Sequence, residues 1–151
     1  MSLRPGKLLP LSILATLLML AGMASAEDYV RIRSRWKPDE VLHIEKGKLE
    51  CGKAESGWFS AQWIKEVVDG HVRFKNRWKP ELYLNIEKGH LDVGEVEIGF
   101  HSAQWSLEKV EDGAVRLKNR WKPDEYVHIE KGAPQSGKIE AGWWSAQWFI
   151  D

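Results

Sequence analysis

The chain has 151 residues, which is enough for one domain of ordinary size, and its 22 basic and 22 acidic residues give a formal net charge of zero. Without a basic surplus, the composition argues against nucleic acid as a partner. The single cysteine, Cys51, cannot form a disulfide within the chain, so we expect it to be a small buried residue in a domain held together by packing.

The first 26 residues have the pattern of a secretory signal peptide. Arg4 and Lys7 precede an apolar run from Leu8 to Met23, and Ala24-Ser25-Ala26 offers the small residues that a signal peptidase requires. The run is shorter than the roughly 20 apolar residues of a membrane-spanning helix. We therefore predict a secreted or periplasmic protein of residues 27–151, with no membrane span once the signal peptide is removed.

The rest of the chain contains the same pattern three times. Ser-Ala-Gln-Trp begins at residues 60, 102 and 145, and each copy is preceded by an Arg-Trp-Lys-Pro and then an Ile-Glu-Lys-Gly. The period is 42 and then 43 residues. Such self-similarity identifies a repeat protein. The three repeats span approximately residues 29–70, 71–113 and 114–151.

Each repeat is predicted to contain four short strands. In the first copy, residues 30–35 alternate between apolar and basic side chains, which is the period of a half-buried strand. A turn at Pro38 leads into a second alternating strand, and Lys46-Gly47 leads into a shorter third strand through Gly52 to Glu55. Ser-Ala-Gln-Trp opens the fourth strand, Trp63 to Val68, and the Asp-Gly that follows is typical of a hairpin turn.

Twelve short strands in three repeats favour an all-β fold, the β-trefoil, in which three hairpins cap a six-stranded barrel around a pseudo-threefold axis. A propeller typically has four or more blades, and helical repeats would not alternate with a period of two. The third repeat ends where a further first strand would begin, so we expect residues 30–35 to close the barrel without an open edge. The tryptophans Trp63, Trp105 and Trp148 are expected to fill the core.

From Gln62-Trp63 through Asp69-Gly70 to Val72-Arg73, and at the two equivalent places, the sequence resembles the ricin-type β-trefoil (ricin B-like lectin) family. That family repeats a Gln/Trp signature that leads into a glycine turn and a new strand. The resemblance covers residues 27–151 and implies carbohydrate binding, with a shallow site in each lobe that sets an aromatic platform beside polar groups. The chain departs from the family in its adjacent Gln and Trp and its lack of disulfides within the lobes. The nearest counterparts of the family's sugar-binding aspartate are Asp39 and Asp124, which Glu81 replaces in the second repeat.

Two stretches of each repeat supply candidate sugar-binding residues. The second strand carries His43, Asn85 or His128, whose side chains can each donate to and accept from a sugar hydroxyl, or are simply polar surface residues. A glycine bend carries an aromatic pair, and Trp144 either contacts a ligand or packs under the hairpin cap. The third repeat is predicted to be the strongest site, because it combines the two adjacent tryptophans with Tyr126 and His128 on the outward face of the second strand and with Asp124 on the turn before it. The full set of candidates is Asp39, His43, Phe59, Tyr83, Asn85, His101, Asp124, Tyr126, His128, Trp143 and Trp144.

Other repeated residues are expected to have structural roles. The glutamates at 45, 87 and 130 are predicted to form exposed cross-strand pairs with basic residues. The tryptophans at 36, 78 and 121 either stack on a ligand as exposed rings or, as we prefer, pack in the core or cap. No Ser-His-Asp order, phosphate loop or Cys/His metal spacing occurs, so we predict no catalytic residue, metal or cofactor. The expected function is a monomeric, non-enzymatic, lectin-like module. The alternative is a trefoil that binds a protein, such as a protease or a cell-surface component.

Overall fold

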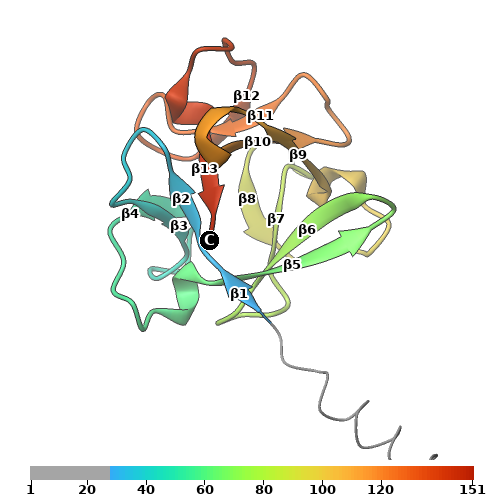
Figure 1. The fold of residues 1–151 in the computed structure, drawn as a ribbon. Coiled ribbons are helices and arrows are strands. Elements are labelled where there is room, and N and C mark those ends of the chain that lie inside the picture. Colours follow the sequence, from blue (N-terminus) through green and yellow to red (C-terminus); the bar gives the residue numbers. More distant parts are fainter. Residues whose placement is uncertain (1–27) are drawn as a thin grey trace, which may run out of the picture.

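The computed structural model describes residues 28–151, which form an all-β fold whose three repeats surround the centre of the molecule (Figure 1). The predicted signal peptide lies outside the described residues. Within residues 28–151, no helix is long and apolar enough to cross a membrane. The central strands are β1 (Tyr29–Val30), β2 (Ile32–Ser34), β5 (Trp63–Val68), β6 (His71–Asn76), β9 (Trp105–Lys109), β10 (Val115–Asn119) and β13 (Trp148–Ile150).

Each repeat adds one hairpin to these central strands. The hairpins are β3 (Val41–His43) with β4 (Glu50–Gly52), β7 (Tyr83–Asn85) with β8 (Asp92–Gly94), and β11 (Tyr126–His128) with β12 (Gln135–Gly137). A short 3-10 helix precedes the last strand of each repeat: η1 (Phe59–Ala61), η2 (His101–Ala103) and η4 (Trp144–Ala146). A further one, η3 (Glu111–Gly113), joins β9 to β10. This arrangement confirms the β-trefoil.

The antiparallel ladder of central strands runs in the order β1-β5-β6-β9-β10-β13-β2. Its two ends, β1 and β2, are successive pieces of one extended segment that is divided at Arg31. The described residues therefore contain thirteen strands instead of the predicted twelve, and the predicted closed barrel is wrong in that the ladder is not continuous. The chain itself joins the ends, and the Asp151 amide donates to the Arg31 carbonyl at 3.1 Å.

The third strand of each repeat lies earlier than predicted. In the first repeat, Gly47 has a φ of +84°, a conformation that glycine adopts without strain, and it turns the chain tightly. In the antiparallel pairing that follows, His43 lies opposite Glu50 and Val41 lies opposite Gly52. Because Val41 is the first residue of β3, residues beyond Gly52 have no partner in that strand, and β4 ends there instead of continuing to Glu55.

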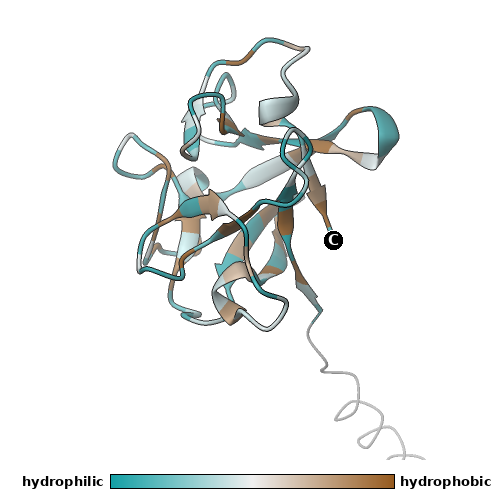
Figure 2. Cartoon of the chain, turned by 90° about the vertical axis from the view of Figure 1, so that its left-hand side faces the viewer, coloured by the Kyte–Doolittle hydropathy of each residue, from teal (hydrophilic) through white to brown (hydrophobic). Residues whose placement is uncertain are grey.

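The core contains the three tryptophans that the Gln-Trp motifs predicted. Trp63, Trp105 and Trp148 are fully buried, together with aliphatic residues of the second strands such as Leu42 and Ile44. Each indole N–H donates to a carbonyl of the hairpin strand in its own repeat, at 3.0–3.1 Å. These bonds satisfy the polar end of a buried tryptophan. Hydrophobic stretches accordingly lie along the central strands, while the loops are mostly hydrophilic (Figure 2).

Candidate functional site

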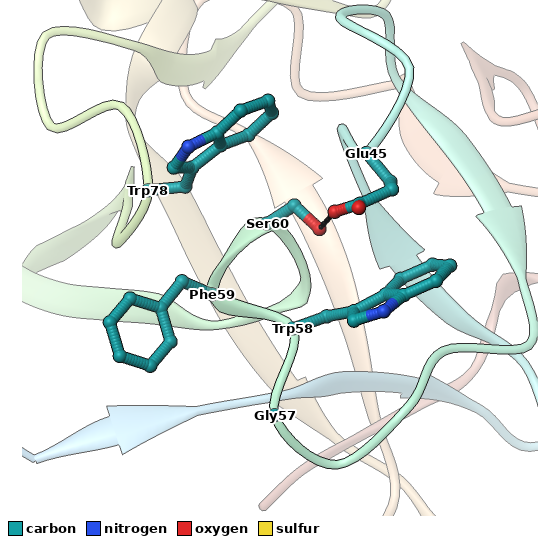
Figure 3. A pocket seen from close by; sticks show the side chains of 6 residues that line it. All are labelled: Glu45, Gly57, Trp58, Phe59, Ser60 and Trp78. Carbon is teal, nitrogen blue, oxygen red and sulfur yellow. Dashed lines mark hydrogen bonds between the residues drawn. The ribbon is translucent and has the colours of Figure 1, made fainter.

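Three equivalent pockets lie where one repeat meets the next. The first has a volume of about 370 Å³ and is lined by Glu45, Gly57, Trp58, Phe59, Ser60 and Trp78 (Figure 3). The second, also about 370 Å³, is lined by Glu87, Gly99, Phe100, His101, Ser102 and Trp121. The third, about 240 Å³, is lined by Glu130, Gly142, Trp143, Trp144, Ser145 and Trp36. Each of these interlobe pockets takes five residues from one repeat and a tryptophan from another.

Hydrogen bonds across the repeat boundary bring that tryptophan into place. In the first pocket, the Arg77 amide donates to the Gln62 carbonyl at 2.8 Å, and its guanidinium donates to Gln62 Oε1 at 2.6 Å. Arg120 and Arg35 make the same side-chain bond, at 2.6 Å, to Gln104 and Gln147. The Gln of Ser-Ala-Gln-Trp therefore holds the Arg-Trp-Lys-Pro turn that carries the pocket tryptophan.

The glutamate of each pocket belongs to the Ile-Glu-Lys-Gly motif. Ser60 Oγ donates to Glu45 Oε1 at 2.6 Å, and Ser145 Oγ donates to Glu130 Oε2 at 2.8 Å. Figure 3 shows the Glu45–Ser60 pair between the rings of Trp58 and Trp78. The prediction that these glutamates pair with basic residues is wrong, because within residues 28–151 no salt bridge includes them. In the first and third repeats, the serine of the following 3-10 helix donates to the carboxylate instead.

The tryptophans of Arg-Trp-Lys-Pro are exposed. Trp36, Trp78 and Trp121 keep 43–47% of their surface, so the expectation that they pack in the core or cap is wrong. The core space is filled by the Gln-Trp tryptophans instead. Trp144 is 50% exposed, so it does not pack under the hairpin cap. The Arg35 guanidinium lies 4.0 Å from the centre of its ring.

Four of the predicted sugar-binding residues line the interlobe pockets: Phe59, His101, Trp143 and Trp144. Asp39 and Asp124 do not. They are exposed and pair with Lys53 and Lys138 at 3.5 and 3.8 Å. Tyr83 and Tyr126 are half-buried on β7 and β11, where burial, with Glu66 and Glu108 nearby, raises the pKa of their hydroxyls. In the third repeat, Asp124 and Tyr126 do not line the pocket with Trp144, whereas His128 packs against Trp143. A role of these residues in binding stays a prediction.

His43, Asn85 and His128 are only 6–7% exposed, so the predicted outward face of the second strand is wrong. The His43 and His128 rings pack edge-on against Trp58 and Trp143, with ring centres 5.7 and 5.9 Å apart. Their Nε2 atoms lie against Gly52 and Gly137, where an added Cβ would be 3.4 Å away. Burial lowers the pKa of both imidazoles. In the second repeat, the smaller Asn85 borders a cavity of about 110 Å³.

Cys51 is half-buried against the core, as expected of a small packing residue, and burial raises the pKa of its thiol to about 12. Such a thiol is not a nucleophile at neutral pH. Among the described residues, no group of three or more His, Cys, Asp or Glu side chains could hold a metal ion.

No family model matches the sequence, and no curated protein matches it. The structure is similar to an endo-β-galactosidase from Clostridium perfringens that releases GlcNAcα1-4Gal, with a TM-score of 0.74 and 36% identity over 81% of this chain. It is also similar to ThreeFoil, a designed threefold-symmetric protein (TM-score 0.67, 20% identity, 81% of this chain and 96% of that one). A third similar structure is SeviL bound to asialo-GM1 saccharide, with a TM-score of 0.68 and 16% identity over 83% of this chain and 98% of that one.

The chain has the ricin-type β-trefoil fold. The resemblance seen in the Gln-Trp and Asp-Gly motifs is thus confirmed at the level of the fold. This β-trefoil spans only 31% of the length of the C. perfringens enzyme. Sequence reasoning missed the pocket glutamates, the serines and the Arg-Trp-Lys-Pro tryptophans. The one signal that could have found them is the identity of Glu, Ser and Trp at these positions in all three repeats, while the aromatic pair between them varies.

Proposed function

We propose that this β-trefoil is a non-enzymatic module that binds carbohydrate at its three interlobe pockets. The observation that carries the proposal is the threefold recurrence of an exposed tryptophan from one repeat beside the aromatic, glutamate and serine side chains of another. A sugar has an apolar face that stacks on a ring and hydroxyls that donate to a carboxylate. Each pocket offers both partners.

The similar structures support this proposal and suggest probes. SeviL is described as bound to asialo-GM1 saccharide, and the C. perfringens enzyme as releasing GlcNAcα1-4Gal. The enzyme is the more similar in sequence, at 36% identity. GlcNAcα1-4Gal and the asialo-GM1 saccharide are therefore the first ligands to test.

The pocket chemistry favours binding without catalysis. Glycoside hydrolysis ordinarily uses two carboxyl groups on opposite sides of the scissile bond, about 5–10 Å apart. Each interlobe pocket is lined by one carboxylate: Glu45, Glu87 or Glu130. A single carboxylate can bind a hydroxyl. Hydrolysis needs one carboxyl group as the general acid and a second as the base or nucleophile, and one group cannot fill both places.

A glycan array followed by titration calorimetry tests the proposal. We expect a glycan hit whose binding is displaced by free sugar and is abolished when Trp36, Trp78 and Trp121 are all changed to Ala. A matched control changes the exposed Val67, which lines none of the three pockets, to Ala. Capture of a protein partner that free sugar does not displace, with no array hit, would instead support the protein-binding alternative.

We also propose that the protein is exported from the cytoplasm and loses residues 1–26. Its support is the charged, apolar and small-residue order of that segment. Intact-mass measurement of exported protein should give a chain that begins at Glu27. Exported protein that retains Met1 would contradict this part of the proposal.

A further inference from the structure

Charge distinguishes the interlobe pockets from ordinary polar grooves. Each is lined by one glutamate and by no lysine or arginine. The glutamate is the same in all three pockets, whereas the exposed aromatic position beside it is Phe59, His101 or Trp144. A group kept in every pocket, while its neighbour varies, is suited to recognise a feature that all three ligands share.

The hydrogen-bonding capacity of this glutamate fixes the polarity of that feature. Ser60 is buried and donates its single hydroxyl proton to Glu45 Oε1, so it has no proton left to donate to a ligand. Glu45 is exposed, and its second oxygen is a further acceptor. In the second pocket, Ser102 Oγ has no hydrogen-bond partner among the described residues, so the exposed Glu87 keeps both carboxylate oxygens as acceptors. The ligand group that meets the carboxylate must therefore be a donor, and a carboxylate, sulfate or phosphate would be repelled.

The surrounding rings favour a donor that is positively charged. Trp58 and Trp78 lie on either side of the Glu45–Ser60 pair (Figure 3). A carboxylate beside tryptophan faces attracts a cation both through a charge-assisted hydrogen bond and through the ring quadrupoles. The third pocket repeats this arrangement with Trp36, Trp143 and Glu130.

The basic residues nearby do not neutralise the glutamate. Lys79 Nζ lies 4.6 Å from the centre of the Trp78 ring, and the Arg77 guanidinium lies 3.6 Å from that of Phe59. Arg77 also donates to Gln62 Oε1. Neither residue lines the pocket, and none of the salt bridges within residues 28–151 joins either of them to Glu45. Their positions show that rings at this boundary already stack with cations.

We propose that Glu45, Glu87 and Glu130 select saccharides that carry a free ammonium group, such as 2-amino-2-deoxy sugars, over N-acetylated and acidic saccharides. This inference rests on the proposed carbohydrate binding at the same pockets. The ammonium donates to the free carboxylate oxygen while the apolar sugar face stacks on the boundary tryptophan. Acetylation removes the charge and places a carbonyl acceptor nearby, so it weakens the interaction.

Titration calorimetry at pH 6, where the sugar amine is protonated, tests this selection with a glucosamine tetrasaccharide and its N-acetylated counterpart. The test variant is the triple substitution Glu45→Gln, Glu87→Gln and Glu130→Gln. A matched control, Glu55→Gln, Glu97→Gln and Glu140→Gln, removes the same number of charges from exposed, equivalent positions outside the pockets. We expect the wild type and the control to bind the amine form at least ten-fold tighter, and the test variant to lose that preference.

Four outcomes would overturn the inference. They are equal or tighter binding of the acetylated form by the wild type, a preserved preference in the test variant, an equal loss in the control, and binding of choline as tight as that of the amino sugar. The last would indicate an ammonium site with no part for the saccharide. If the wild type binds the amine form no tighter than the acetylated form, while a neutral glycan binds in a manner dependent on Trp36, Trp78 and Trp121, the proposed function stands and this inference fails.

Discussion

Two tryptophans four residues apart, Trp144 and Trp148, have opposite roles in the structure. Trp148 is fully buried and donates to the Val127 carbonyl, whereas half of Trp144 is exposed. Trp148→Ala should cost about 3–5 kcal/mol of unfolding free energy, because it leaves a large cavity and an unsatisfied carbonyl. Trp144→Ala should cost about 1 kcal/mol or less, since it loses a partly exposed cation–π contact.

Urea denaturation of both variants measures this difference, and glycan titration provides the second readout. Trp144→Ala should weaken glycan binding while it remains folded. Equal destabilisation by the two substitutions would show that Trp144 belongs to the core.

The buried histidines predict a stability that depends on pH. His43 Nδ1 accepts from the Glu45 amide, and His128 Nδ1 accepts from the Glu130 amide, both at 3.2 Å. Protonation of Nδ1 would break these bonds, and burial already lowers both pKa values. Because the unfolded chain then binds protons at a higher pH than the folded chain, stability should be complete above the unfolded pKa of about 6.5. It should decline as pH falls from there toward the folded pKa.

Thermal unfolding at pH 7.5 and pH 5 measures this decline. The double substitution His43→Asn and His128→Asn should make the melting temperature less dependent on pH in that window. Asn is the suitable replacement because Asn85 Oδ1 accepts the same bond from the Glu87 amide, at 2.9 Å. A double variant that loses as much stability as the wild type on acidification would contradict a role of these histidines.

At the scale of elements, the contact between Ser-Ala-Gln-Trp and the Arg-Trp-Lys-Pro turn joins one repeat to another. Arg35 is 7% exposed and donates to the buried Gln147 Oε1 at 2.6 Å. Arg35→Ala should cost about 1.5–3 kcal/mol, because it leaves a buried amide oxygen without its charged partner. Arg33→Ala is the control, since Arg33 pairs with Asp151 at the surface and should contribute at most about 1 kcal/mol. Equal losses in chemical denaturation would refute the proposed importance of the Gln147 contact.

The elements themselves were largely predictable because the repeats reinforce one another. Alternation at residues 30–35, the turn glycines and the three Gln-Trp motifs each report a local property, and the structure agrees with them. The division of the first strand at Arg31 was not predictable, because nothing in its alternating pattern marks a break in the ladder. His43 shows a second limit. Period two assigns it to the face opposite Leu42, yet that face is covered by Trp58, which comes from a distant part of the repeat.

The candidate site was predictable only in part, for a related reason. Phe59, His101, Trp143 and Trp144 follow a glycine bend and could be chosen by local chemistry alone. Glu45 and Trp78 lie 33 positions apart in sequence and in different repeats, and they meet only because Gln62 holds Arg77. A pattern within one repeat carries no information about that contact. Asp39 and Tyr83 do not line these pockets, and their part in binding stays a prediction.

At the scale of the whole molecule, the third pocket requires both ends of the domain. Trp36 comes from the first repeat, whereas Trp143, Trp144 and Glu130 come from the last. The pairing of β13 with β2 brings these segments together. The third pocket therefore exists only when the N-terminal strand has joined the sheet, whereas the first and second pockets form between consecutive repeats.

The third pocket should also bind glycan most strongly, because its three rings are all tryptophans, while the second has Phe100, His101 and Trp121. Trp36→Ala should lower affinity for a glycan hit about ten-fold, which corresponds to about 1.4 kcal/mol of lost stacking. Trp121→Ala should lower it less than about three-fold. Trp36 and Trp121 are 43% and 47% exposed, so both variants should remain folded and their titrations are directly comparable. An equal loss in both variants would mean that the pockets contribute equally, and a larger loss in Trp121→Ala would place the main site in the second pocket.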